Sequence, residues 1–130
     1  MAGIQGFHHL SLSVTELESS TRWYQEVLGL NLEANGRGPS FRRSRLSAAE
    51  GRLKLTLTSH DEQSNEPFSE LRTGMDHVAF RVESAEAVKN RLDLLGVNHS
   101  GIKASGGGMT MITFRDPDNI QLEVFEAPTP

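Results

Sequence analysis

Two stretches of the sequence decide the fold, His9-Leu-Ser-Leu-Ser-Val14 and His77-Val-Ala-Phe-Arg-Val82. Each opens on a histidine, ends on a valine, and alternates apolar residues with small or polar ones, as a half-buried strand does. An amphipathic helix is expected after each stretch, and a glycine ends it, Gly29 in the first case and Gly96 in the second. The spacing from histidine to glycine is nearly the same in both, so the chain contains an internal repeat.

The residues around the two helices predict the rest of each repeat. The first helix is expected to begin at a capping box, Thr15-Glu-Leu-Glu18, and the second after Ser84. A short strand should follow each glycine, near 29–32 and near 96–99. Two longer strands complete each copy, near 40–46 and 53–58 in the first and near 109–114 and 119–126 in the second. The last two are joined by the turn Asp116-Pro-Asp-Asn119.

The predicted order, strand-helix-three strands twice over, places the chain in the α+β class. We expect one structural domain with a first βαβββ module at residues 1–60, a polar linker at 61–73 and a second βαβββ module at 74–130. Two such modules in tandem can pair their sheets into a curved sheet that encloses a metal cavity.

Composition narrows the class of protein. The chain has 130 residues, 36% of them hydrophobic and 23% charged, with a net charge of −4. This is typical of a single folded domain and gives no electrostatic basis for nucleic acid or an anionic membrane as a partner. No apolar run approaches the ~20 residues of a membrane span, and no signal-peptide pattern opens the chain. Cysteine is absent, which agrees with a reducing cytoplasm and leaves imidazole and carboxylate to bind any metal.

Strand periodicity predicts which side chains share a face. The apolar residues of the first, fifth and last strands must face the helices, which sends their neighbours to the opposite face. That face carries one histidine from each copy and one carboxylate: His9, His77 and Glu123. A single strand histidine is usually a hydrogen-bonded or exposed residue, and a single glutamate is usually solvated. The conjunction of all three on one face is what predicts a divalent metal site.

Four segments, spread over nearly the whole chain, carry a resemblance to a known family: Phe7-His-His-Leu-Ser-Leu-Ser-Val14, Trp23-Tyr-Gln-Glu-Val-Leu-Gly-Leu30, Met75-Asp-His-Val-Ala-Phe-Arg-Val82 and Phe114-Arg-Asp-Pro-Asp-Asn-Ile-Gln-Leu-Glu-Val-Phe125. They resemble the vicinal oxygen chelate superfamily, which includes glyoxalases, extradiol dioxygenases, methylmalonyl-CoA epimerases and bleomycin- and fosfomycin-resistance proteins. The resemblance implies that His9, His77 and Glu123 are metal ligands. Strand parity selects His9, because it sends His8 to the other face.

The resemblance implies a fourth ligand as well, a Glu or Gln on the fourth strand, for glyoxalases and epimerases. This chain has Lys54 or Thr56 there, depending on register, and neither is a normal ligand. His60 shares their parity at the end of that strand and is the alternative. Three ligands with open positions are typical of non-haem Fe(II) oxygenases. We therefore interpret the chain as an extradiol-dioxygenase-like enzyme acting on a phenolic or polyketide-like small molecule.

Several alternatives stay open. Fe(II) is the expected ion, one per site, and Mn(II), Ni(II), Co(II) or Zn(II) are the alternatives. A glyoxalase- or epimerase-like lyase or isomerase, a thiol transferase and an antibiotic-binding resistance protein are the competing functions on this scaffold. Family members of this length are usually homodimers, so the site could be completed within one chain or across the dimer.

Other polar and aromatic residues on the strands are candidates for catalysis or substrate binding. They are Arg81, Lys54, Thr56, His60, Ser11 and Phe125. A basic cluster, Arg42, Arg43 and Arg45, alternates between the two faces of its strand. Either a solvated edge or recognition of phosphate or carboxylate is consistent with that cluster.

Overall fold

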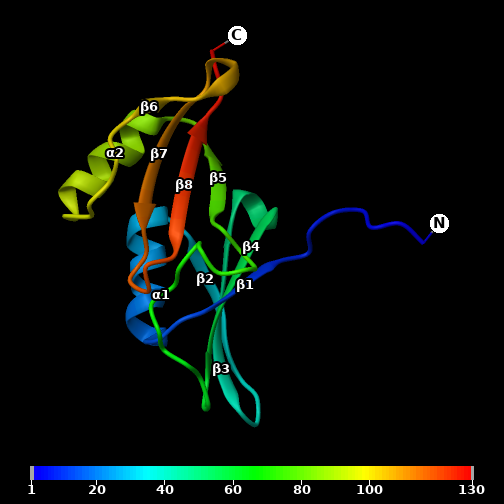
Figure 1. Ribbon diagram of the computed structural model, residues 1–130. Coiled ribbons are helices and arrows are strands. Elements are labelled where there is room, and N and C mark those ends of the chain that lie inside the picture. Colours follow the sequence, from blue (N-terminus) through cyan, green and yellow to red (C-terminus); the bar gives the residue numbers. More distant parts are fainter. Residues whose placement is uncertain (1, 130) are drawn as a thin grey trace. The chain divides into compact units, whose positions relative to one another are not determined.

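Each half of the chain folds as one strand, one helix and three further strands in the computed structural model, which describes residues 2–129 (Figure 1). The chain divides after Asn65 into two compact units, coloured blue to green and green to red in Figure 1. The predicted α+β class and the tandem pair of βαβββ modules are confirmed. No helix within residues 2–129 is long and apolar enough to cross a membrane.

The first unit contains β1 (Leu10–Ser13), α1 (Leu17–Leu28), β2 (Asn31–Arg37), β3 (Phe41–Ala48) and β4 (Leu53–His60). Its sheet has the order β1-β4-β3-β2, with β1 parallel to β4 and the other neighbours antiparallel. A short 3-10 turn, η1 (Ala49–Gly51), joins β3 to β4. The helix α1 contacts β2, β3 and β4, so it covers one face of this sheet.

The second unit repeats this plan with β5 (Val78–Val82), α2 (Ala85–Leu94), β6 (Lys103–Ala104), β7 (Thr110–Arg115) and β8 (Gln121–Glu126). Its sheet has the order β5-β8-β7-β6, again with the first pair parallel. A 3-10 turn, η2 (Gly106–Gly108), precedes β7. The helix α2 contacts β7 and β8.

The burial of the strands agrees with the predicted alternation. In the first unit Leu55 and Leu57 of β4 are at most 1% exposed, and in the second unit Leu122 and Val124 of β8 are equally buried. Each such side chain contributes about 1.5–3 kcal/mol by leaving water. The residues between them, such as Glu123, are half-buried. The polar residues of these strands therefore lie on the face away from the helix.

The two helices begin differently. In α2 the Oγ of Ser84 accepts a hydrogen bond from the backbone N–H of Ala87, as expected for an N-cap. The capping box predicted for α1 is wrong, because the helix starts at Leu17 with Glu16 at the N-cap position and no capping bond from its side chain. The carboxylate of Glu18 instead pairs with Arg42 on β3. The carboxylate that the capping box would use is thus engaged in an ion pair with a residue of the sheet.

The prediction of a strand near 96–99 is also wrong. Only one isolated bridge, between His99 and Phe114, forms there, and the paired strand β6 starts at Lys103. The imidazole Nδ1 of His99 accepts from the backbone N–H of Gly101, and its Nε2 lies 2.6 Å from Asp93. These side-chain bonds, together with the left-handed backbone of Gly101, replace the regular ladder with a turn.

Candidate metal centre

The strand registers identify the first-unit counterpart of Glu123. In the parallel pair β5–β8, Glu123 pairs with Ala79, which is two positions after His77. In the parallel pair β1–β4, Thr56 pairs with Ser11, which is two positions after His9. Thr56 is therefore the repeat counterpart of Glu123, and the first unit offers no carboxylate at that position. By the same register, Lys54 is the counterpart of Gln121.

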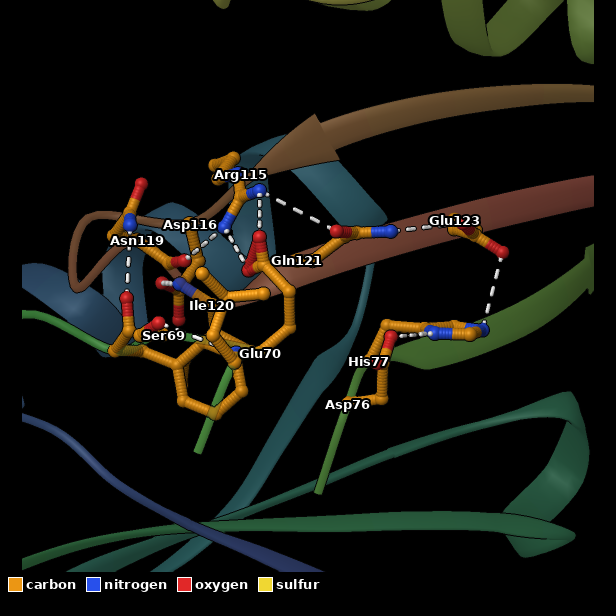
Figure 2. A network of polar contacts seen from close by, with 12 residues as sticks. Ser69, Glu70, Asp76, His77, Arg115, Asp116, Asn119, Ile120, Gln121 and Glu123 are labelled. Atoms are coloured by element: carbon orange, nitrogen blue, oxygen red, sulfur yellow. Dashed lines mark hydrogen bonds and ion pairs between the residues drawn. The ribbon is translucent and has the colours of Figure 1, made fainter. Parts of the chain in front are cut away.

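His77 and Glu123 face each other within the second unit (Figure 2). The Nε2 of His77 lies 3.2 Å from the Oε1 of Glu123. Two adjacent ligands of an octahedral ion, with bonds of about 2.1 Å, are about 3 Å apart. The pair therefore has the donor types and the spacing that one divalent ion requires. The His77 side chain is 37% exposed and Glu123 is 12% exposed, which leaves the pair open to an ion from solvent.

Asp76 contacts the far side of the same imidazole. Its Oδ1 lies 2.7 Å from the Nδ1 of His77. A carboxylate at this place fixes the tautomer and the ring orientation, as it does for many metal-binding histidines. The hydrogen bond to Asp76 raises the pKa of His77 above its ordinary value, and the charge of Glu123 adds to this effect. Because Asp76 contacts Nδ1, the other ring nitrogen, Nε2, is the one that faces Glu123.

The other oxygen of Glu123 is held by a chain of polar contacts, also drawn in Figure 2. The side-chain N–H of Gln121 donates to Oε2 of Glu123 at 3.0 Å, and Arg115 donates to the amide oxygen of Gln121 at 3.3 Å. Arg115 also forms a two-pronged ion pair with Glu70, at 2.8 and 2.9 Å. Its hydrogen bonds lower the pKa of Glu70 to about 2. The contacts fix the amide of Gln121 with its donor toward Glu123.

These supporting residues were not singled out from the sequence. Gln121 had a usable signal, because it lies two positions before Glu123 on the same strand face. Asp76 could have been found as the carboxylate adjacent to a candidate ligand. Glu70 had no signal at all, since it lies in the polar segment between the repeats and contacts Arg115 only through the folded chain.

His9 lies in a different setting. It lines a cavity of about 690 Å³ in the first unit, together with Lys54 and Thr56. His8 lines the same cavity, and the Nδ1 atoms of the two histidines are 2.8 Å apart. The expectation that His8 points to the opposite face is therefore wrong, because β1 begins only at Leu10 and strand alternation does not extend to the histidines. What selects His9 is its repeat correspondence with His77.

The remaining candidates fall into three places. Ser11, on the edge strand β1, lies beside Thr58 of β4, with their hydroxyl oxygens 3.3 Å apart. His60, at the end of β4, packs its ring against Phe41 and is not among the residues that line the cavity. In the second unit, Arg81 and Phe125 share a smaller cavity of about 270 Å³.

The structure thus brings together His77 and Glu123, with Asp76 behind the imidazole, and places His9 in the cavity of the other unit. No group of three or more His, Asp or Glu side chains that could hold a metal ion is found among residues 2–129. The metal triad therefore stays a prediction, and the structure shows only the contact between His77 and Glu123 within the second unit.

This fold and these motifs define a protein class. The model of the Glyoxalase/Bleomycin resistance protein/Dioxygenase superfamily matches residues 6–124. The chain belongs to this superfamily, so the resemblance carried by its four motifs is confirmed. A solved domain of the same superfamily from Frankia sp. EAN1pec is 32% identical, with a TM-score of 0.88, and the match covers 96% of this chain and 93% of that one.

Two curated relatives extend the comparison. YaeR of Escherichia coli (strain K12) is 26% identical over 97% of this chain and 99% of its own length. Lactoylglutathione lyase of Schizosaccharomyces pombe is 30% identical over 90% of this chain, which spans only 46% of that relative. A mutant of the fosfomycin resistance protein FosX of Listeria monocytogenes, solved with Mn(II) and 1S,2S-dihydroxypropylphosphonic acid, shares the fold at 22% identity and a TM-score of 0.73, over 98% of this chain and 95% of that one.

Proposed function

We propose that the chain binds one divalent metal ion through His9, His77 and Glu123 and uses it on a small-molecule substrate. The observation that carries the proposal is the contact of His77 Nε2 with Glu123 Oε1 at 3.2 Å, backed by Asp76 on the other ring nitrogen. The repeat supplies His9 as the third donor. The first unit that provides His9 belongs to the same chain or to the partner in a homodimer.

We further propose Fe(II) oxygen chemistry on a phenolic or polyketide-like substrate. The support is the residue of the first unit that occupies the repeat position of Glu123. This residue is Thr56, so no fourth ligand with a carboxylate is present at that position. Two imidazoles and one carboxylate leave neighbouring positions of an ion open for a substrate oxygen and O₂. Bound Fe(II) would supply Lewis acidity toward the phenol and electrons for O₂.

The residues of the chain itself supply orientation. Asp76 occupies Nδ1 of His77, so that nitrogen is not available to an ion. Gln121 occupies one oxygen of Glu123 and leaves the other directed to His77. Preorganised ligands of this kind bind an ion without a further loss of side-chain freedom. The cavity beside His9 is large enough, at about 690 Å³, for a small aromatic substrate.

A lyase or isomerase that uses the same triad is the second candidate. It is favoured by the 30% identity with lactoylglutathione lyase over 90% of this chain. Such an enzyme needs a base close to a substrate carbon. The position of Thr56 has no metal-binding carboxylate that could act as this base. Glu50, a carboxylate that lines the cavity, would be the residue of this chain to take that role.

Metal binding and O₂ consumption separate the proposals. Freshly purified protein should contain one divalent ion per chain, and titration of the stripped protein with Fe(II) or Mn(II) against a chromophoric chelator should show one tight site. O₂ uptake with a phenolic substrate supports the oxygenase. Turnover under strict anaerobiosis, supported by Ni(II) or Co(II), would replace it with the lyase or isomerase. Absence of any tight metal site would contradict both.

A further inference from the structure

The cavity beside His9 contains three cationic side chains, which lie on two neighbouring strands. Arg43 and Arg45 come from β3, and Lys54 comes from β4. Arg45 pairs in register with Thr56, and Lys54 pairs with Ser47. The cations therefore flank Thr56, the position where the repeat lacks a carboxylate.

None of these three cations has an ion-pair partner among residues 2–129. The guanidinium of Arg43 is held by stacking, with its carbon 4.2 Å from the centre of the Phe41 ring, and its Nε is buried without a hydrogen-bond partner. Stacking of this kind fixes the plane of the guanidinium and leaves its terminal N–H groups available to a ligand.

The carboxylates of the cavity do not neutralise these cations in the structure. Glu33 accepts a hydrogen bond from the hydroxyl of Ser47, and Glu50 belongs to the turn η1. The neighbouring Arg42 behaves differently, because it points to the helix side of the sheet and pairs with Glu18. Of three arginines close together on β3, the one on the helix side is neutralised, and the two in the cavity are not.

We propose that Arg43, Arg45 and Lys54 bind an oxyanion group, a carboxylate or a phosphate, of the small molecule that enters the cavity beside His9. Clustered cations without partners repel one another, and an anion removes this cost while it receives charge-assisted hydrogen bonds. The inference rests on the proposed function only for the statement that the anion belongs to the substrate. Binding of the anion requires the first-unit cavity and no metal ion.

The test is a titration of the full, metal-free chain followed by ¹⁵N-¹H correlation spectra. Inorganic phosphate and benzoate are added in separate arms, and the tighter of the two identifies the group that the cavity prefers. We expect saturable shifts at the backbone amides of β3 and β4 that line the cavity. Arg45→Gln and Lys54→Gln should each weaken the tighter probe by about tenfold, the usual value of one charge-assisted hydrogen bond.

Arg42→Gln is the matched control, because it removes the same charge from the same strand on the other face. Both Arg45 and Lys54 are exposed, so the variants should keep a dispersed spectrum like that of the parent. Shifts that never saturate with either probe, or an equal loss from Arg42→Gln, would show diffuse attraction and overturn the inference. Metal titration of the same samples distinguishes the failures, since intact metal binding without anion binding removes only this inference.

Discussion

The two repeats have the same strand order and register but carry different chemistry at matching positions. The second unit places Glu123 opposite His77 and surrounds the pair with hydrogen-bonding partners. The first unit places Thr56 at the position that matches Glu123, and Lys54 at the position that matches Gln121. Backbone pairing does not depend on these outward-facing side chains, so the two copies can differ at matching positions while they keep the same fold. The two proposals follow this difference, since Glu123 of the second copy is a proposed metal ligand and Lys54 of the first is a proposed anion ligand.

The turn between the last two strands of each repeat differs in the same way. In the second unit, one carboxylate oxygen of Asp116 accepts from the backbone N–H groups of Asp118 and Ile120. In the first unit, Ala49 and Glu50 adopt left-handed backbone angles, with φ of 52° and 56°, that L-residues disfavour. Both turns contain backbone hydrogen bonds, such as the one from the N–H of Arg52 to the carbonyl of Ala49 in the first, but only the second adds the side-chain bonds of Asp116.

The largest effect should follow from removing the carboxylate that distinguishes the repeats. Glu123→Ala should weaken metal binding by more than about 100-fold, because loss even of a residue that only supports a ligand costs about 10–100-fold. Thr56→Ala, the matched change in the first unit, should leave the affinity unchanged. Calorimetric or chelator-competition titration of both variants measures this. Equal losses in the two variants would show that the repeats share the metal in another way.

Next in size is the loss of the carboxylate in the second turn. Asp116 is buried and holds two backbone N–H groups, so Asp116→Ala should lower the free energy of unfolding by about 2 kcal/mol. Chemical denaturation followed by circular dichroism provides the measurement. Glu50→Ala in the first turn has no such hydrogen bonds to lose, and its effect should be within about 0.5 kcal/mol. A comparable loss in both variants would remove the contrast between the turns.

A smaller effect should separate Gln121 from its counterpart. Gln121→Leu keeps the volume of the side chain but removes the N–H that holds Oε2 of Glu123, and we expect metal affinity to fall by about tenfold. Lys54→Leu should not lower metal affinity, since its position faces no carboxylate ligand in the register. If Gln121→Leu binds the metal as tightly as the parent, the polar chain from Glu70 to Glu123 has only a structural role.

Sequence periodicity predicts the long elements because burial selects alternate residues of a strand, as at Leu55 and Leu57. It fails where side chains compete with the backbone, as at His99, whose imidazole bonds convert the expected strand into a turn. It also misplaced His8, because alternation holds only inside a paired strand and β1 begins after it.

Of the candidate centre, His77 and Glu123 were both predicted from the repeat and the strand parity, and the structure brings them within 3.2 Å. Their supporting residues depend on contacts that no local pattern encodes. Glu70 meets Arg115 across a separation of 45 residues, and only the folded unit brings them together. Strand pairing likewise decides between Lys54 and Thr56, which the sequence alone leaves open.

The smallest expected effect concerns the backbone of the first turn. Ala49→Gly should raise the free energy of unfolding by about 0.5 kcal/mol, because glycine adopts the left-handed conformation without the steric cost that alanine has there, although it loses more chain entropy on folding. The adjacent Ala48 has extended angles, with φ of −150°, so Ala48→Gly should instead be destabilising by about 0.5–1 kcal/mol. Denaturant midpoints of the two variants measure the difference. If both variants lose stability, the turn is not strained, and its left-handed residues are a tolerated feature of the hairpin.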